Sequence, residues 1–178
     1  MQLNYIANAS APSSSGRTIP VIDPSDGQVF DEIQRSNAQD IDAAVHAARQ
    51  CHDAVWSKVS AAERGRLLMK LSAKVAEHAD ELAAIEQRDC GKPTRQAKAD
   101  ALALVRYFEY YAGACDKLHG ETIPYQDGYS VLTWREPHGV TGHIIPWNYP
   151  MQIFGRSVGG ALAAGNVSVV KPAEDACL

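Results

Sequence analysis

The sequence has no block of basic residues: Lys and Arg number 17 against 21 Asp and Glu, and the net charge is −4. Nucleic acid is therefore not an expected partner. A membrane-spanning run is also missing, because Asn166 and Ser168 interrupt the most hydrophobic tract, residues 158–170. No early basic cluster precedes an apolar segment. We therefore expect no secretory signal, no membrane contact and a cytoplasmic location.

Metal and disulfide spacings are equally scarce. The sequence contains neither a CxxC nor an HxxxH pair, so no zinc site is expected. Four cysteines are too few to form a disulfide scaffold in a chain of 178 residues. We expect Cys51, Cys90, Cys115 and Cys177 to be reduced thiols that pack as small apolar groups.

The first third of the chain shows two kinds of pattern. Residues 1–18 are rich in Ser, Ala and Asn with little periodicity, which predicts a loosely ordered start that can carry a short strand. Residues 19–33, IPVIDPSDGQVFDEI, place a DPSDG turn between two apolar runs. They predict two short strands joined by a turn.

Helical periodicity follows. A first helix is expected over residues 41–55, capped by Ser36, Asn37 or Asp40. A second opens at Ser60 with the Ser-x-x-Glu spelling of a capping box.

The second helical pattern should bend near residues 78–80 and stop at Gly91, since Lys92-Pro93 follows. A third is expected from a cap at Thr94 to Gly120. The apolar stripes of the last two patterns contain Leu67, Leu68, Leu71, Val75, Ala79, Leu82, Ile85, Leu104, Val105, Phe108, Tyr111, Ala112, Cys115 and Leu118.

After Gly120 the pattern changes to strands. Residues 130–137 and 139–145 each predict a strand, residues 150–164 a helix, and residues 167–170 a buried strand. This order is the opening of a parallel α/β unit. No linker or repeat is visible, so helices and strands are expected to be layers of one protein.

The loop HIIPWNYP, residues 143–150, lies where open α/β sheets bind ligands, at the carboxyl end of a strand. Pro146 and Pro150 stiffen the backbone around Trp147 and Asn148. An Asn amide can donate to an oxygen that becomes negative in a transition state. Alternatively, Asn148 closes an Asx turn and Trp147 fills the core.

The next strand ends in Lys171-Pro172-Ala173-Glu174. Its ammonium can donate to, and its carboxylate can accept from, a pair of vicinal hydroxyls such as a ribose presents. Alternatively, Lys171 and Glu174 form an exposed ion pair on a turn.

Residues 139–174, GVTGHIIPWNYPMQIFGRSVGGALAAGNVSVVKPAE, closely resemble the aldehyde dehydrogenase superfamily. The motifs IDPSDGQ, GRLL, RDCGKP, RYF, YYAG and EPHGV occur upstream in the family's order. The resemblance covers about residues 19–178. It implies an α/β fold in which N-terminal helices and oligomerisation strands precede the start of a Rossmann-like parallel cofactor domain.

The resemblance also implies an activity, the oxidation of an aldehyde to a carboxylic acid with NAD. It assigns to Asn148 the donor for the oxyanion of a Cys thiohemiacetal, which later becomes a thioester. Lys171 and Glu174 would bind the adenosine ribose. The carboxylate should repel a 2′-phosphate, so NAD is favoured while NADP stays possible. The remaining residues expected at the cofactor are Ile144, Ile145, Pro146, Trp147, Pro172 and Ala173.

Two further features follow from the resemblance. Residues around 121–138 correspond to strands that pair with another subunit, so a homo-oligomer, dimer or tetramer, is expected. A monovalent cation is implied near the Ile22 carbonyl and Asp89, although Asp89 can equally be part of a helix end.

The family's catalytic Cys and general-base Glu have no counterparts in this sequence, and the catalytic domain is expected to lie outside it. The segment alone is therefore predicted to be inactive. Two readings stay open: the N-terminal part of a working NAD-dependent aldehyde dehydrogenase, or a non-catalytic module that only assembles with other subunits. The aldehyde is not specified by these residues.

Overall fold

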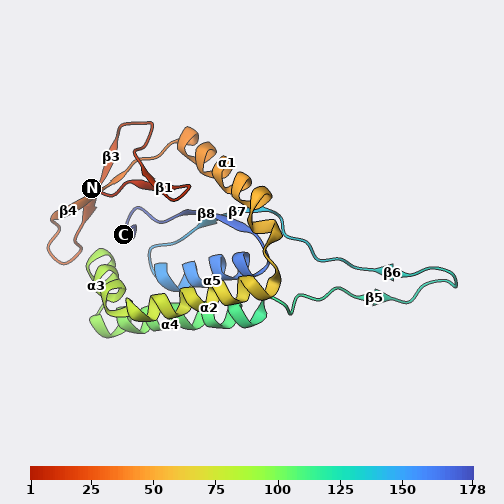
Figure 1. Ribbon diagram of the computed structural model, residues 1–178. Helices are drawn as coiled ribbons and strands as arrows, with labels where there is room; N and C mark the ends of the chain where they lie inside the picture. The colour runs from red at the N-terminus through yellow and green to blue at the C-terminus, as the bar shows by residue number, and fades with distance from the viewer.

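The computed structural model describes residues 1–178 as a body of helices and short strands from which one long arm projects (Figure 1). The strands are β1 (Asn4–Ile6), β2 (Ala9–Ala11), β3 (Thr18–Ile22), β4 (Val29–Gln34), β5 (Thr122–Ile123), β6 (Val131–Leu132), β7 (Val140–Ile144) and β8 (Val167–Lys171). The helices are α1 (Ala38–Ala54), α2 (Ala61–Glu77), α3 (Ala79–Cys90), α4 (Thr94–Ala114) and α5 (Pro150–Ala163), with a 3₁₀ turn at Trp56–Lys58.

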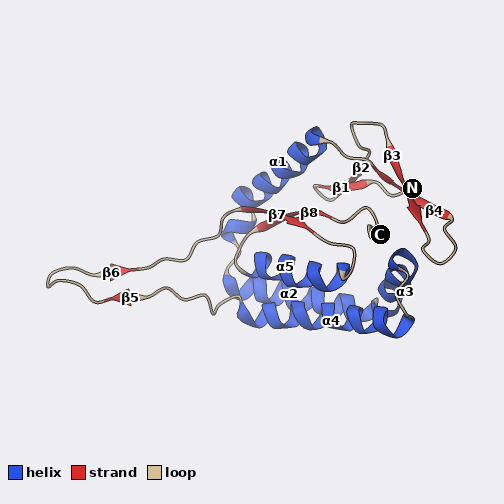
Figure 2. Ribbon diagram, turned by 180° about the vertical axis from the view of Figure 1, so that it is seen from behind, coloured by secondary structure: helices blue, strands red, loops and turns tan.

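The parallel pair β7–β8 forms the middle layer of the body. Helix α1 lies on one side of it and α5 on the other, and α2 and α4 pack beyond α5 (Figure 2). The predicted strand, loop, helix and strand are confirmed, and β7 and β8 pair in parallel from Val140–Val167 to Ile144–Lys171. The expected burial of the last strand is wrong: no residue of β8 is fully buried, and Val170 is 37% exposed. None of the helices is long and apolar enough to cross a membrane.

The N-terminal region contains two antiparallel hairpins. The two strands predicted around DPSDG are β3 and β4, which confirms that expectation. The segment expected to be loosely ordered forms the β1–β2 hairpin. Buried Ser13 joins its end to α1, because its Oγ donates to Asp40 Oδ2 over 2.6 Å. Such a polar anchor leaves no periodic pattern in the sequence.

The starts of α1 and α2 follow from their capping residues. Among the three candidates for α1, Asn37 is the N-cap, and it forms a reciprocal capping box with Asp40. Ser60 and Glu63 form the predicted capping box of α2. These side chains satisfy amide groups that the first helical turn leaves without partners.

The predicted bend and stop of the second helix are also confirmed. His78 separates α2 from α3, and Gly91 ends α3 with a φ of 68°. A Cβ at Gly91 would also meet Pro24 Cγ at 2.8 Å. Glycine therefore serves both the left-handed turn and the close approach of the β3–β4 turn.

Two predicted boundaries of the third helix are wrong. Thr94 is the first residue of α4, and the preceding Pro93 occupies the cap position without a side-chain hydrogen bond. The helix ends at Ala114 rather than near Gly120. Leu118, the apolar residue that extended the predicted stripe, is 60% exposed, so no core is available to hold another turn.

The strand predicted over residues 130–137 is too long. Only Val131–Leu132 pairs, and its partner is Thr122–Ile123 at the other side of the arm. Two chain segments leave the body side by side to form the arm, and this short ladder pairs them along part of its length (Figure 1). Its alternating residues therefore have no second strand in this chain with which to continue the ladder.

The core lies between α2, α4 and α5. Its buried members are Leu68, Val75, Leu104, Phe108, Cys115 and Ala163. Small residues let α5 approach α4 closely: a Cβ at Gly155 would lie 2.7 Å from Leu104 Cδ1. Each fully buried large apolar side chain contributes about 1.5–3 kcal/mol. Leu67, Leu71 and Ile85 belong to the predicted stripe but are exposed.

Candidate functional site

The two loops singled out by sequence lie side by side at the carboxyl ends of β7 and β8. Ile144 and Lys171 are register partners at the end of the parallel ladder. Directly beyond them the Ile145 amide donates to the Lys171 carbonyl oxygen over 2.9 Å. The PWN loop, residues 146–149, and the Lys171–Glu174 turn therefore share one edge of the sheet, where α/β folds bind ligands.

Asn148 is exposed at this edge, and its side chain makes no hydrogen bond within the chain. The Asx turn, which would use the Asn148 oxygen, is therefore not formed. Trp147 is 61% exposed, so it does not fill the core either. The loop thus presents a free amide beside a large apolar ring, both on a backbone bounded by Pro146 and Pro150.

Lys171 and Glu174 meet in the turn after β8. Lys171 Nζ donates to Glu174 Oε1 over 2.8 Å, and both side chains are about half exposed. The hydrogen bond from Lys171 is the main reason that the pKa of Glu174 lies below its usual value. The turn therefore carries one ammonium donor and one ionised acceptor together. This pair suits a vicinal diol and is also the exposed ion pair of the alternative reading.

The other residues expected at the cofactor differ in exposure. Ile144 is 83% exposed, and Pro146 and Pro172 are exposed as well. Ala173 is half-buried. Ile145 is only 4% exposed, so its side chain belongs to the interior and only its backbone belongs to this edge.

A buried charged cluster beneath the PWN loop did not emerge from the sequence patterns. Lys92, between α3 and α4, donates to Glu86 Oε1 over 2.6 Å and to Asp100 Oδ2 over 2.5 Å. We call Glu86, Lys92 and Asp100 the corner cluster. A clue was available: Asp100 stands between Ala97 and Leu104 on the apolar face of α4, where a charge needs a partner.

Burial and hydrogen bonding act in opposite directions on the corner cluster. Burial alone raises the pKa of Asp100, but the hydrogen bonds from Lys92, Gln152 and Gln96 outweigh it and lower the pKa. Burial lowers the pKa of Lys92, and its bonds to Asp100 and Glu86 outweigh that and raise it. For Glu86 burial dominates over the bond from Lys92, and together with the nearby Asp100 and Asp89 carboxylates it raises the pKa. The Glu86 Oε2 atom has no partner. The Lys92–Asp100 pair is therefore the firmly ionised part.

Three of the four cysteines, Cys90, Cys115 and Cys177, show the features of structural thiols, whereas the prediction that Cys51 packs as a small apolar group is wrong because Cys51 is exposed. Burial, reinforced by the nearby Asp89 and Glu86, raises the pKa of Cys90 to about 12. Burial raises the pKa of Cys177 to about 11 and raises that of Cys115. A thiol with such a pKa is protonated near neutral pH and is a poor nucleophile. No cysteine pair forms a disulfide, and Cys51 is exposed.

Asp89, one of the two residues expected near a monovalent cation together with Ile22, lies buried at the end of α3. Asp89 is 5% exposed, and its Oδ1 has no partner, while Oδ2 accepts from the Leu178 amide over 2.9 Å. The neighbours Asp23 and Arg88 form an ion pair at 3.5 Å, which brings the end of β3 to the end of α3. A buried carboxylate oxygen without a partner fits a cation, and the cation stays a prediction. No group of three His, Cys, Asp or Glu side chains forms a metal site.

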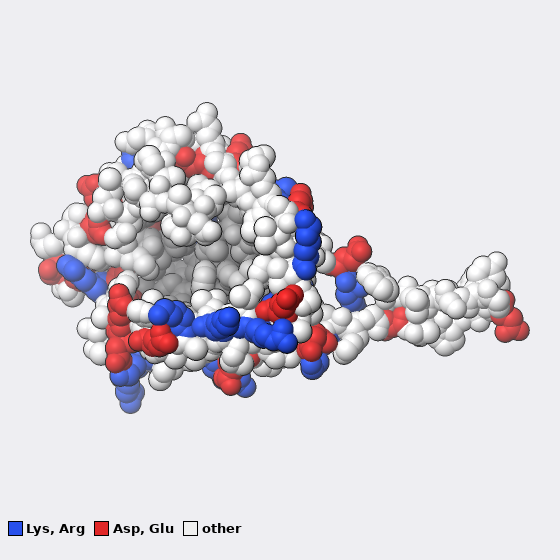
Figure 3. Space-filling view, viewed as in Figure 1, with Lys and Arg blue, Asp and Glu red and all other residues white.

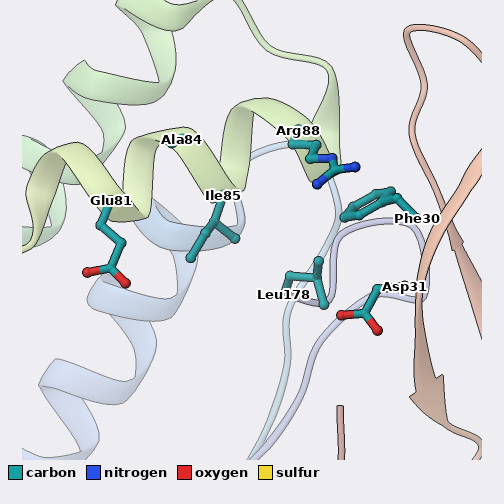
Figure 4. Close-up of a pocket in the computed structure, with 7 residues that line it drawn as sticks. All are labelled: Phe30, Asp31, Glu81, Ala84, Ile85, Arg88 and Leu178. Carbon is teal, nitrogen blue, oxygen red and sulfur yellow. The ribbon is translucent and has the colours of Figure 1, made fainter. Parts of the chain in front are cut away.

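An open pocket lies elsewhere, between β4 and α3 (Figure 4). Its lining residues are Phe30, Asp31, Glu81, Ala84, Ile85, Arg88 and Leu178. The Arg88 guanidinium carbon lies 4.1 Å from the centre of the Phe30 ring. The lining offers no nucleophile and none of the residues of the β7–β8 edge. We therefore place the candidate site at the strand ends and not in this pocket.

Residues 11–178 match the family model described as "Aldehyde dehydrogenase family". The chain belongs to the aldehyde dehydrogenase family. A relative, the Saccharomyces cerevisiae protein named "Aldehyde dehydrogenase (NAD(P)+) 2", is 44% identical over 176 residues, which are 98% of this chain and 35% of the relative. The resemblance found in the sequence motifs is thereby confirmed.

Solved structures of aldehyde dehydrogenases share the fold of this chain. A Burkholderia cenocepacia protein assigned as an aldehyde dehydrogenase superposes with a TM-score of 0.97 at 67% identity, over 99% of this chain and 37% of that one. PnpE of Pseudomonas sp. WBC-3, solved with nicotinamide adenine dinucleotide, gives a TM-score of 0.92 at 39% identity, over 96% of this chain and 35% of PnpE. This aldehyde dehydrogenase segment thus spans about a third of the relatives it matches.

Proposed function

We propose that this chain supplies the oxyanion donor and the adenosine-binding edge of an enzyme that oxidises an aldehyde to a carboxylic acid with NAD. The observation that carries the proposal is Asn148, whose free amide stands at the carboxyl end of β7 beside the Lys171–Glu174 turn. Family membership and the NAD held by the similar PnpE structure support the same reaction.

Asn148 acts on the carbonyl oxygen of the substrate. A Cys thiolate from outside this chain attacks the aldehyde carbon, a C–S bond forms, and the carbonyl electron pair moves to the oxygen. The Asn148 N–H donates to this oxyanion and stabilises it more than it stabilises the ground-state carbonyl. A nicotinamide cofactor, when bound, supplies the hydride acceptor. Water activated by a Glu, also outside this chain, then hydrolyses the thioester.

The β7–β8 edge fits the adenosine end of the cofactor. Lys171 can donate to a ribose hydroxyl and Glu174 can accept from one, while Ile144 offers an exposed apolar surface beside them. Pro146, Trp147, Pro172 and Ala173, with the Ile145 backbone, complete this edge. A 2′-phosphate would lie against the ionised Glu174, so the proposed cofactor is NAD rather than NADP.

The cofactor assignment is tested by Glu174→Gln in the protein that carries this segment together with its catalytic residues. Removing the charge should weaken NAD binding and raise the affinity for NADP relative to NAD. Dissociation constants for both cofactors, measured by titration of protein fluorescence, give the ratio directly. A ratio that stays at the wild-type value would remove this role from Glu174.

Which aldehyde the enzyme oxidises is a question for a substrate assay. We propose to measure NADH formation from aliphatic, aromatic and amino aldehydes, because the family reaction is common to all three. Oxidation of none of them by the complete protein would contradict the proposed function. The cytoplasmic location stays a prediction from the sequence.

The projecting arm favours a role in assembly as well. Figure 3 shows charged groups at the tip and at the base of the arm and mostly uncharged surface between them, and the exposed apolar side chains of the arm are Ile123, Tyr125, Tyr129, Leu132 and Trp134. We propose that it pairs with a second subunit in a homodimer or homotetramer, which would cover an open strand edge. The second candidate function, a non-catalytic assembly module, rests on this arm. An intact native mass corresponding to 178 residues, without a companion chain, would favour the module.

A further inference from the structure

The PWN loop and the start of α5 contact the corner between α3 and α4. Three loop or helix positions around Asn148 contact this corner: Trp147 directly before it, Tyr149 directly after it, and Gln152 in the first turn of α5. Asn148 itself has no side-chain hydrogen bond within the chain. Its neighbours are therefore fixed while its amide stays available.

The first contact holds the backbone. Cys90 Sγ lies 3.7 Å from the Trp147 carbonyl oxygen and donates to it. Burial raises the pKa of Cys90 to about 12, so the thiol keeps the proton that it donates. A thiol is a weak donor, and this contact serves to orient the carbonyl more than to bind it.

The second contact holds the Tyr149 side chain. Lys92 Nζ lies 4.5 Å from the centre of the Tyr149 ring, within the range of a cation–π interaction. The same ammonium is bound by Glu86 and Asp100. Because the side chain of Lys92 is only 12% exposed, water competes little for these interactions.

The third contact joins the corner to α5. Gln152 Nε2 donates to Asp100 Oδ1 over 2.8 Å, and Asp100 is fully buried. Gln96 Nε2 donates to the same Oδ1, also over 2.8 Å, but Gln96 and Asp100 both belong to α4. The two amides are thus chemically alike, and only Gln152 connects two separate elements.

We propose that Asp100 and Gln152 position the oxyanion donor by fixing the first turn of α5 against α4, with Lys92 and Cys90 holding the loop before it. This inference rests on the proposed function of Asn148. Asp100 and Gln152 are positioning residues, since they reach the reacting atoms only through the loop. A donor displaced by a fraction of an ångström loses part of its effect on the transition state, because oxyanion stabilisation depends on distance and direction.

The two glutamines provide a matched experiment. Gln152→Met removes the amide that links α5 to α4 and keeps the side-chain volume, and Gln96→Met removes the amide that stays within α4. Both variants are made in the protein that carries this segment with its catalytic residues. Steady-state kinetics give kcat and the KM for NAD, and hydrogen exchange reports the amide of Ile153, which bonds to the Tyr149 carbonyl.

Gln152→Met should lower kcat about tenfold with little change in the KM for NAD, and Ile153 should exchange about tenfold faster, since one hydrogen bond to a charged group is lost. Gln96→Met should keep the wild-type kcat and the wild-type exchange at Ile153. Equal effects of the two substitutions would overturn the inference, because Gln152 would then be only structural. If the unaltered protein oxidises no aldehyde, the proposed function fails. The exchange comparison, which needs no activity, then decides the positioning by itself.

Discussion

The corner between α3 and α4 and the projecting arm are opposite in construction. The side chains of the corner cluster are charged and at most 12% exposed, and that of Asp100 is completely inaccessible. The two sides of the arm are joined by the short β5–β6 ladder and by hydrogen bonds between Glu121 and Thr133, and the arm exposes large apolar groups, with Trp134 at 80% exposure. Charge lies inside in one region and apolar surface lies outside in the other.

This contrast shows which region is complete within the chain. In the corner cluster each charged group except the second Glu86 oxygen has a partner from this chain, so the geometry of the cluster is set internally. The arm has apolar side chains and strand edges without partners, so its stability depends on another surface. The PWN loop, which carries Asn148, contacts the corner and not the arm.

The largest expected effect concerns Lys92 itself. Lys92→Met would leave Glu86 and Asp100 buried without their cation, and breaking such a buried pair costs about 3–5 kcal/mol. The matched control is Lys98→Met, which removes an exposed ion pair with Asp80 at 2.7 Å. That change should cost about 0–1 kcal/mol. Urea denaturation measures both.

Similar losses of unfolding free energy for Lys92→Met and Lys98→Met would contradict the claim that the corner cluster is held together by its buried ion pairs. They would mean that water or rearranged side chains satisfy Glu86 and Asp100 without Lys92. The cluster could not then be the rigid support that we assign to the loop.

A smaller effect on subunit stability is expected in the arm. Leu132→Gln, at a side chain that is 59% exposed, should change the free energy of unfolding of the subunit by no more than about 0.5 kcal/mol. It should nevertheless reduce the oligomer mass seen by sedimentation, because a polar group would enter the proposed contact. The control is Leu102→Gln on α4, at 53% exposure. An unchanged oligomer in both variants would leave the arm without its proposed partner.

Local chemistry made much of the fold predictable. A capping box identified the start of α2, and capping residues narrowed the start of α1 to three candidates. Gly91 identified the end of α3, and apolar periodicity identified α5 and its flanking strands. The boundaries that failed depended on distant contacts. Residues near Leu118 have helical spacing but nothing to pack against. The arm has strand spacing but a partner for only two residues on each side.

The residues of the candidate site also fall into those that the sequence indicated and those that only the structure revealed. Asn148, Lys171 and Glu174 could be singled out as candidates because strand ends and prolines are visible in the sequence. The corner cluster was missed because Lys92 and Asp100 come from a turn and a helix whose approach depends on tertiary packing. A single carboxylate on the apolar face of α4 was the sequence feature that pointed to it. Likewise, exposure of Trp147 could be decided only by the structure.

The most direct test of the account is Asn148→Ala in the complete protein, with kcat and the dissociation constant for NAD measured together. Loss of one oxyanion donor should lower kcat by about two to three orders of magnitude and leave the NAD constant nearly unchanged. An unchanged kcat, or a loss of NAD affinity that accounts for the whole effect, would contradict the role of Asn148 and with it the central claim.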